Sequence, residues 1–262
     1  MSTATVTRPA ARTAGRRSAL GQLALTELKL YLRERLRLFF GVGFPLMLTI
    51  IIGSIPAFNK PEAVYGGQTF LDVYVPIMVA FTAALLSLTA LPMMLASYRE
   101  RGVLRRLETT PIGPARVLAA QLLANLAVAV VTMVAVLVLA RFGYNVPLPR
   151  ELGGFAIAAL LATVALMSVG LFIAAVVPSA KAAQATGALL FYPLMFFAGL
   201  WLPIANMPAW LQHVSHATPL GAAVQALTDS ATGHWPTALQ LGTLAAYAVA
   251  FGLAAAKTFR WE

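Results

Sequence analysis

Six long runs without any Asp, Glu, Lys, Arg or His constrain the fold of this chain more than any other feature of the sequence. They cover residues 38–58, 73–98, 117–140, 152–177, 182–204 and 237–256. About 20 apolar residues cross the hydrocarbon core of a bilayer as a helix, and each run reaches that length. The 262-residue chain is 60% hydrophobic and only 11% charged, which excludes an ordinary soluble domain. The sequence therefore predicts an all-α integral membrane protein with six transmembrane helices.

The distribution of positive charge indicates how these helices are oriented. An even number of spans places both termini on one side, and nearly all Lys and Arg residues fall on that side. The opposite side holds only Lys60, Arg141 and Arg150. The positive-inside rule therefore predicts cytosolic N- and C-termini. The net charge of +10 follows from this asymmetry, so no nucleic-acid partner is expected.

Two segments precede the first span. Residues 1–17 are basic and rich in Ala and Thr, and no signal-peptide core follows them, which predicts a disordered cytosolic tail. Residues 18–37 begin a single membrane domain that extends to 262. Apolar residues recur there at three- and four-residue steps opposite a mostly basic stripe that includes Lys29 and Arg33. This pattern predicts an interfacial helix in the headgroup region, with a plain extension of the first span as the alternative.

The segment 99–116, RERGVLRRLETTPIGPAR, separates the second and third runs. A charged side chain at the bilayer centre costs about 2.5–3.5 kcal/mol, so this segment is expected to stand in water. Val103, Leu104 and Leu107 share one side of a helix, and charged residues lie on the other. Residues 109–114 then break that helix. The pattern predicts a short amphipathic cytosolic helix that contacts a soluble partner.

The outward segment 205–236 has few charges but is not continuously apolar. One helical face carries Trp210, Leu211, Val214 and Ala217. After Pro219, apolar residues resume at Leu220, Val224 and Leu227. Two short amphipathic helices that enter the outer leaflet and return would satisfy this pattern.

The chemistry missing from the chain limits its function. Membrane-embedded catalysts and ion-coupled pumps need ionisable groups at depth, and the six runs hold no Asp, Glu, Lys, Arg or His. The dipeptide Gly-Lys never occurs, so the chain has no phosphate-binding loop of the Walker type. We therefore expect no catalytic residue, no bound cofactor and no enzyme activity. Any energy that the protein uses must come from another protein.

The remaining polar residues have structural interpretations. Asp72, at the mouth of the second span, is predicted to cap a helix rather than to carry protons. His213 and His216 are three residues apart, a spacing compatible with a metal. The chain has no cysteine, however, and Asp229 is the one nearby carboxylate, so no metal site is expected. The polar residues inside spans are predicted to form interhelical hydrogen bonds rather than ligand contacts. They are Gln121, Asn125, Gln184 and Tyr192.

Two stretches carry a family resemblance. RERGVLRRLETTPIGPARVLAAQ and GLWLPIANMPAWLQHVSHATPLGAAVQAL, in this order among six spans, resemble the type-2 ABC transporter permease family. The similarity is to its drug-resistance and polysaccharide export branch, including daunorubicin-exporter-like membrane subunits, and it covers nearly the whole chain. The resemblance implies that 18–37 is a connecting helix and that 207–226 is a reentrant pair capping an export path.

The resemblance also implies partners and a mechanism. Two permease chains, identical or different, would work with two ATPase subunits that hold ATP and Mg, in the plasma membrane of a bacterium. The ATPase would receive a coupling helix in 99–116. The residues expected to couple are Arg99, Glu100, Arg101, Gly102, Leu104, Arg105, Arg106, Leu107 and Glu108.

The cargo is expected to be hydrophobic or amphiphilic, such as a drug or a lipid-like or glycan-linked molecule. Its path would be lined by uncharged and aromatic side chains, of which Phe196 and Phe197 could equally face lipid. The residues proposed for this path are Phe191, Tyr192, Phe196, Phe197 and Trp201. The alternative function is a membrane-anchored interaction or immunity protein that recruits a cytosolic partner without transport.

Overall fold

The computed structural model describes residues 16–62, 65, 67–102 and 114–258, and within these ranges it is all-helical. The first half comprises α1 Arg16–Arg33, α2 Arg35–Leu38, the π-helix η2 Phe39–Gly43, α3 Phe44–Gly53, the 3-10 helix η3 Pro56–Asn59, α4 Phe70–Ala84, the π-helix η5 Leu85–Ala90 and α5 Leu91–Glu100. The second half comprises α7 Pro114–Tyr144, α8 Leu152–Val176, α9 Ala180–Phe197, the 3-10 helix η6 Ile204–Asn206, α10 Ala209–Ala217, α11 Pro219–Thr232 and α12 Ala238–Thr258.

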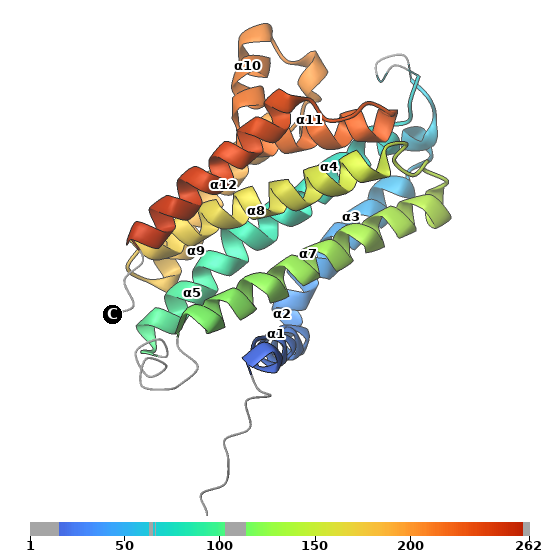
Figure 1. Ribbon diagram of the computed structural model, residues 1–262. Coiled ribbons are helices and arrows are strands. Elements are labelled where there is room, and N and C mark those ends of the chain that lie inside the picture. Colours follow the sequence, from blue (N-terminus) through green and yellow to red (C-terminus); the bar gives the residue numbers. More distant parts are fainter. Residues whose placement is uncertain (1–15, 63–64, 66, 103–113, 259–262) are drawn as a thin grey trace, which may run out of the picture.

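The long helices run alongside one another, and α10 lies at the opposite end of the bundle from α1 and the end of α5 (Figure 1). The continuous rod of α4, η5 and α5 forms the centre, because 78% of its most apolar window is buried against 17% for α12. Met78, Val79 and Leu88 on this rod are fully enclosed. The rod packs against α7, α8, α9 and α11, so it contacts most of the other long helices of the bundle.

Among the described residues, four helices are long and apolar enough to cross a membrane. They are Phe70–Glu100, Leu118–Tyr144, Leu152–Val176 and Ala238–Thr258. These helices coincide with four of the uncharged runs that the sequence predicts as spans, 73–98, 117–140, 152–177 and 237–256. The runs at 38–58 and 182–204 correspond to shorter helices, Phe39–Gly53 and Ala180–Phe197.

Both shorter helices end earlier than the hydrophobic runs predicted. In the first, Ile55 adopts an extended conformation immediately before Pro56, as proline disfavours a helical residue in front of it. In the second, the chain turns at Gly199, whose φ of +85° is open mainly to glycine. The length of an apolar run alone does not predict where the helix inside it ends.

Helix α1 is separate from the helix that follows it. Glu34 lies between α1 and α2, and α1 turns away from the direction of α3 in Figure 1. Helix α1 packs on α7 instead. The predicted helix 18–37 is therefore divided in two, which favours a distinct helix over an extension of the first span. The predicted tail 1–17 overlaps α1 at Arg16 and Arg17, and residues 1–15 lie outside the described part of the chain.

Segment 205–236 contains two helices, α10 and α11, that meet at the predicted break before Pro219. Thr218 caps α11, since its hydroxyl accepts a hydrogen bond from the Gly221 N–H at 3.1 Å. Leu220, Val224 and Leu227 are buried as expected. The predicted face of α10 is divided, because Leu211 is buried while Trp210 and Val214 are exposed.

Asp72 is a helix cap, as predicted. Its carboxylate accepts the Thr69 N–H at 2.9 Å, and the Thr69 hydroxyl oxygen accepts the Asp72 N–H at 3.1 Å. This reciprocal pair is a capping box that begins α4.

Candidate functional site

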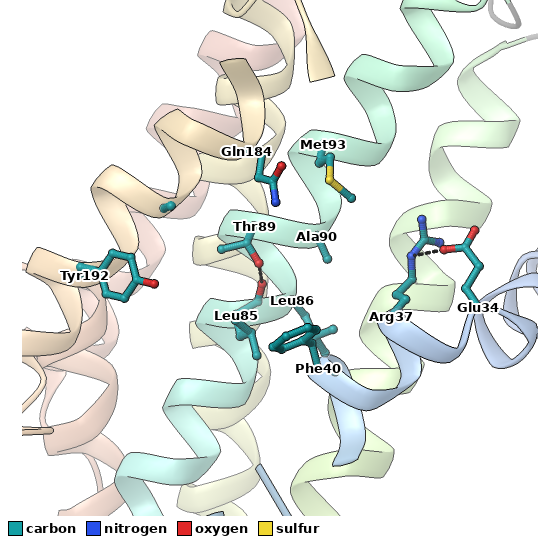
Figure 2. Close-up of a pocket in the computed structure, with 12 residues that line it drawn as sticks. Glu34, Arg37, Phe40, Leu85, Leu86, Thr89, Ala90, Met93, Gln184 and Tyr192 are labelled. Carbon is teal, nitrogen blue, oxygen red and sulfur yellow. Dashed lines mark hydrogen bonds and ion pairs between the residues drawn. The ribbon is translucent and has the colours of Figure 1, made fainter. Parts of the chain in front are cut away.

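A pocket of about 380 Å³ opens between η2, the central rod and α9. Figure 2 shows the side chains that surround it. Its lining is mostly apolar: Glu34, Arg37, Phe40, Gly41, Leu85, Leu86, Thr89, Ala90, Met93, Gln184, Ala188 and Tyr192.

Two π-helical segments form much of the pocket wall. Phe40 and Gly41 come from η2, and η5 contributes Leu85, Leu86, Thr89 and Ala90. The wide turn of a π-helix occurs mostly as a single turn inside α-helices, frequently at functional sites. Both segments continue into α-helices on either side. The pocket therefore lies where two otherwise regular helices are each interrupted by a π-helical turn.

The η5 turn is held by close packing against two glycines. A methyl group at Gly170 of α8 would overlap the Ser87 carbonyl oxygen, and one at Gly187 of α9 would overlap the Leu88 carbonyl oxygen. Because both neighbours are backbone atoms, they cannot move aside as a flexible side chain could. The geometry of this pocket wall therefore depends on two residues without side chains.

The polar groups at one edge of the pocket are largely paired with each other. Arg37 Nε lies 3.0 Å from Glu34 Oε2, and its guanidinium lies 5.7 Å from the centre of the Tyr31 ring. Burial raises the pKa of Tyr31 to about 12, so its hydroxyl stays protonated and donates to the Arg37 carbonyl at 3.1 Å. The Thr89 hydroxyl donates to the Leu85 carbonyl of its own helix. A ligand would therefore meet a mainly apolar surface, with Gln184 and Tyr192 as further polar groups.

The five residues predicted to line a path lie in different surroundings. Tyr192 lines the pocket, while Phe191 is buried with its ring 5.6 Å from that of Phe81. Phe196 and Phe197 contact each other edge to face. Trp201 is 60% exposed. The role of these five residues in a path stays a prediction. The π-helical segments that line the pocket were not predicted from the sequence.

A polar junction lies where α5 ends. The Arg99 guanidinium donates to the carbonyls of Ala174 at 3.1 Å and Ala175 at 3.3 Å, and also to that of Val177. The adjacent Glu100 Oε1 accepts the Ala180 N–H at 3.0 Å. Arg99 thus holds the end of α8, and Glu100 holds the beginning of α9.

A second set of polar contacts ties α1 to the same end. Gln121 Nε2 of α7 donates to the Tyr98 hydroxyl of α5 at 3.2 Å, and that hydroxyl donates to Glu27 Oε2 of α1 at 3.5 Å. Burial raises the pKa of Glu27, and the hydrogen bonds from Gln121 and Tyr98 partly oppose this shift. The residues of both sets, Glu27, Tyr98, Arg99, Glu100 and Gln121, together make up the polar junction.

The interhelical role predicted for Gln121 is confirmed. For Asn125 it is wrong, because its amide donates to the Gln121 carbonyl in its own helix at 2.9 Å. A short intrahelical bond was available one turn away, so no partner helix was needed. Gln184 and Tyr192 line the pocket instead.

The predicted coupling residues are only partly described. Arg99 and Glu100 bind the protein's own backbone, Arg101 is exposed, and Gly102 has a φ of +65°. The remaining five fall within 103–113, outside the described residues, as does the predicted amphipathic helix. They are Leu104, Arg105, Arg106, Leu107 and Glu108.

His213 and His216 lie near each other on α10. The rings of His213 and His216 are 6.4 Å apart and both side chains are exposed. In the part of the chain that the structure describes, no three His, Cys, Asp or Glu side chains gather closely enough to hold a metal ion.

Four long apolar helices in the described part of the chain, one of which is the buried central rod, define a multi-pass membrane protein. Residues 18–231 match the family model described as "ABC-2 type transporter". The chain belongs to this family, which confirms the resemblance seen in its sequence.

Similar proteins include "Probable multidrug ABC transporter permease YbhR" of Escherichia coli strain K12 and of Escherichia coli O157:H7. Each is 23% identical to this chain over 146 residues, which is 56% of this chain and 40% of the relative. The match therefore spans less than half of the length of these relatives.

Proposed function

We propose that this chain is the permease subunit of an ATP-driven exporter and that it binds a hydrophobic or amphiphilic substrate in the pocket of Figure 2. Family membership supports transport, and the relative named as a multidrug ABC transporter permease supports this type of cargo. The observation that carries the proposal is the pocket itself. Its volume of about 380 Å³ lies within the range of roughly 300–1,000 Å³ found for small-molecule sites.

The pocket chemistry supports an amphiphilic cargo. Phe40, Leu86 and Met93 offer apolar surface, while Gln184 and Tyr192 can form hydrogen bonds with a ligand. Glu34 and Arg37 at the pocket edge form an ion pair with each other, so a ligand would not meet an unpaired charge from either residue. A neutral or weakly charged molecule with a large apolar part matches this lining.

A six-span topology in a bacterial plasma membrane, with both termini in the cytosol, forms part of the proposal. Helix Ala180–Phe197 has 18 residues, or about 27 Å at 1.5 Å per residue, close to the roughly 30 Å of a hydrocarbon core. The continuous helical segment 35–53 has a similar length. Helices α10 and α11 would then form the reentrant pair at the outer surface.

The partners proposed are two ATPase subunits, which bind ATP and Mg, and a second permease chain. Segment 99–116 would receive the ATPase. Large apolar side chains on the α9 side of the pocket are exposed, with Leu189 at 75% and Tyr192 at 62%. A second permease copy, identical or different, would cover these side chains and complete the path.

A pocket-filling variant tests this function. The full chain is reconstituted with its ATPase, and Ala188→Trp is expected to lower the ATP hydrolysis stimulated by a subsaturating substrate concentration at least about tenfold by occupying the pocket. The matched control is Ala246→Trp, on an exposed position of α12. Equal, full stimulation in both variants would contradict binding in this pocket.

The alternative, an interaction protein that recruits a partner without transport, makes a different prediction. It would bind the ATPase or another cytosolic protein, but no substrate would stimulate hydrolysis by the wild-type complex. The same assay therefore separates the two functions.

A further inference from the structure

We propose that Arg99 and Glu100 form a latch that transmits movement of the end of α5 to the junction of α8 and α9, instead of contacting the ATPase. This inference rests on the proposed function, since it assumes an ATPase whose binding moves the end of α5. It assigns two residues of the coupling set a positioning role inside the permease.

The Arg99 side chain binds the end of α8. The last carbonyls of a helix lack partners within it, and a cation there also complements the negative end of the helix dipole. Arg99 donates to Ala174, Ala175 and Val177, which are carbonyls of the final turn and the residue after it. The planar guanidinium has enough donors to reach several carbonyls at once, which a lysine ammonium does less well.

Glu100 binds the start of α9 in the complementary way. The first N–H groups of a helix are unpaired, and an anion there is favoured by the positive end of the dipole. The Ser179 hydroxyl accepts the Ala182 N–H at 3.2 Å, and Glu100 accepts the Ala180 N–H at 3.0 Å. Two consecutive residues of opposite charge thus hold two helix ends of opposite polarity.

The latch leads directly to the pocket wall. Gln184, one turn beyond Ala180, lines the pocket, and Ala188 and Tyr192 follow on the same helix. On the other side, Arg99 and Glu100 end the helix that carries Met93 and the η5 turn. A displacement of the end of α5 would therefore move both walls of the pocket together.

The neighbouring Arg101 provides the contrast. Its side chain is exposed, whereas Arg99 and Glu100 are turned to the backbone of α8 and α9. Charge at Arg101 remains available to a partner. If Arg99, Glu100 and Arg101 all docked the ATPase, replacing any one of them would weaken ATPase binding in the same way.

The test uses the full chain assembled with its ATPase. Arg99→Ala and Glu100→Ala are expected to keep ATPase affinity and the KM for ATP within about twofold, while substrate-stimulated hydrolysis falls about tenfold. Glu100→Gln retains an acceptor oxygen and should recover most of the stimulation. Lys257→Ala, which removes an exposed positive charge outside segment 99–116, is the control and should keep stimulation.

A spectroscopic measurement covers the case in which activity is lost for other reasons. The natural chain has no cysteine, so Arg101→Cys and Lys181→Cys can be spin-labelled as a pair on exposed positions. The latch predicts a narrow distance distribution that broadens when Arg99→Ala is added.

The outcomes separate this inference from the proposed function. A wild-type complex without substrate-stimulated hydrolysis overturns the function. A stimulated wild type with unchanged stimulation in Arg99→Ala and Glu100→Ala, or with weakened ATPase binding in both and no recovery in Glu100→Gln, overturns the latch alone. An unchanged distance distribution in the labelled Arg99→Ala chain also overturns it.

Discussion

The pocket and the polar junction lie on the same central rod but are built in different ways. The pocket wall depends on shape, with two π-helical turns and with glycines that admit backbone oxygens. The junction depends on directed polar contacts between helices, and Arg99, Glu100 and Gln121 each reach another helix. A shape-based site can accept varied apolar ligands, whereas directed contacts hold helix ends in register.

The largest expected effect concerns the packing of η5. Gly187→Val would place carbon atoms where the Leu88 carbonyl oxygen lies, so we expect a loss of about 3 kcal/mol in the free energy of unfolding. Thermal or denaturant unfolding in detergent measures this loss. The control is Gly242→Ala on α12, where nothing lies within 4 Å, and it should be neutral or stabilise by up to about 1 kcal/mol. Similar stability of both variants would show that the glycine contact does not shape the pocket.

The next effect tests the junction at its most connected residue. Arg99→Ala removes hydrogen bonds from a charged group to the end of α8, so we expect a destabilisation of about 2 kcal/mol. Arg101→Ala, at an exposed site, should change stability by less than about 0.5 kcal/mol. Equal unfolding midpoints for these two variants would place Arg99 outside the junction.

A smaller effect separates an interhelical from an intrahelical amide. Gln121→Ala loses a hydrogen bond to the Tyr98 hydroxyl of another helix and should cost about 1 kcal/mol. Asn125→Ala loses a bond to its own helix, and alanine regains helix propensity, so the cost should be smaller. Unfolding of the two variants in the same detergent makes the comparison. The reverse order would contradict the role of Gln121 as a link between α5 and α7.

The smallest effect is a pH dependence at Glu27. Since burial raises the pKa of this carboxyl in the folded state, the folded protein holds the proton more tightly than the unfolded chain. The stability of the wild type relative to Glu27→Gln should therefore fall as the pH rises from below the ordinary glutamate pKa through the raised one. Unfolding midpoints of both proteins across the acidic range test the sign. A relative stability that increases with pH would contradict the burial of Glu27.

Much of the fold could be predicted from the sequence, because uncharged runs and helix caps are local signals. Four spans, the Asp72 cap and the break before Pro219 follow from such patterns. The ends of the shorter helices depended on turns at Ile55 and Gly199, inside otherwise apolar runs.

The candidate site was much less predictable. The π-helical lining at Phe40, Gly41 and Leu85–Ala90 has no period that distinguishes it from ordinary helix. The charges of Arg99 and Glu100 attracted attention in the sequence, but their partners are backbone groups about 75 to 80 residues away. Backbone partners leave no mark on the sequence, so these contacts required the three-dimensional arrangement.

The most direct test of separate binding and transmission sites is substrate-stimulated ATP hydrolysis by the reconstituted complex, measured over a range of substrate concentrations. We predict that Ala188→Trp raises the concentration for half-maximal stimulation at least about tenfold, because it fills the pocket. Glu100→Ala should leave that concentration unchanged and lower the maximum. If both variants changed the same parameter in the same way, the pocket and the junction would not be distinct functional sites.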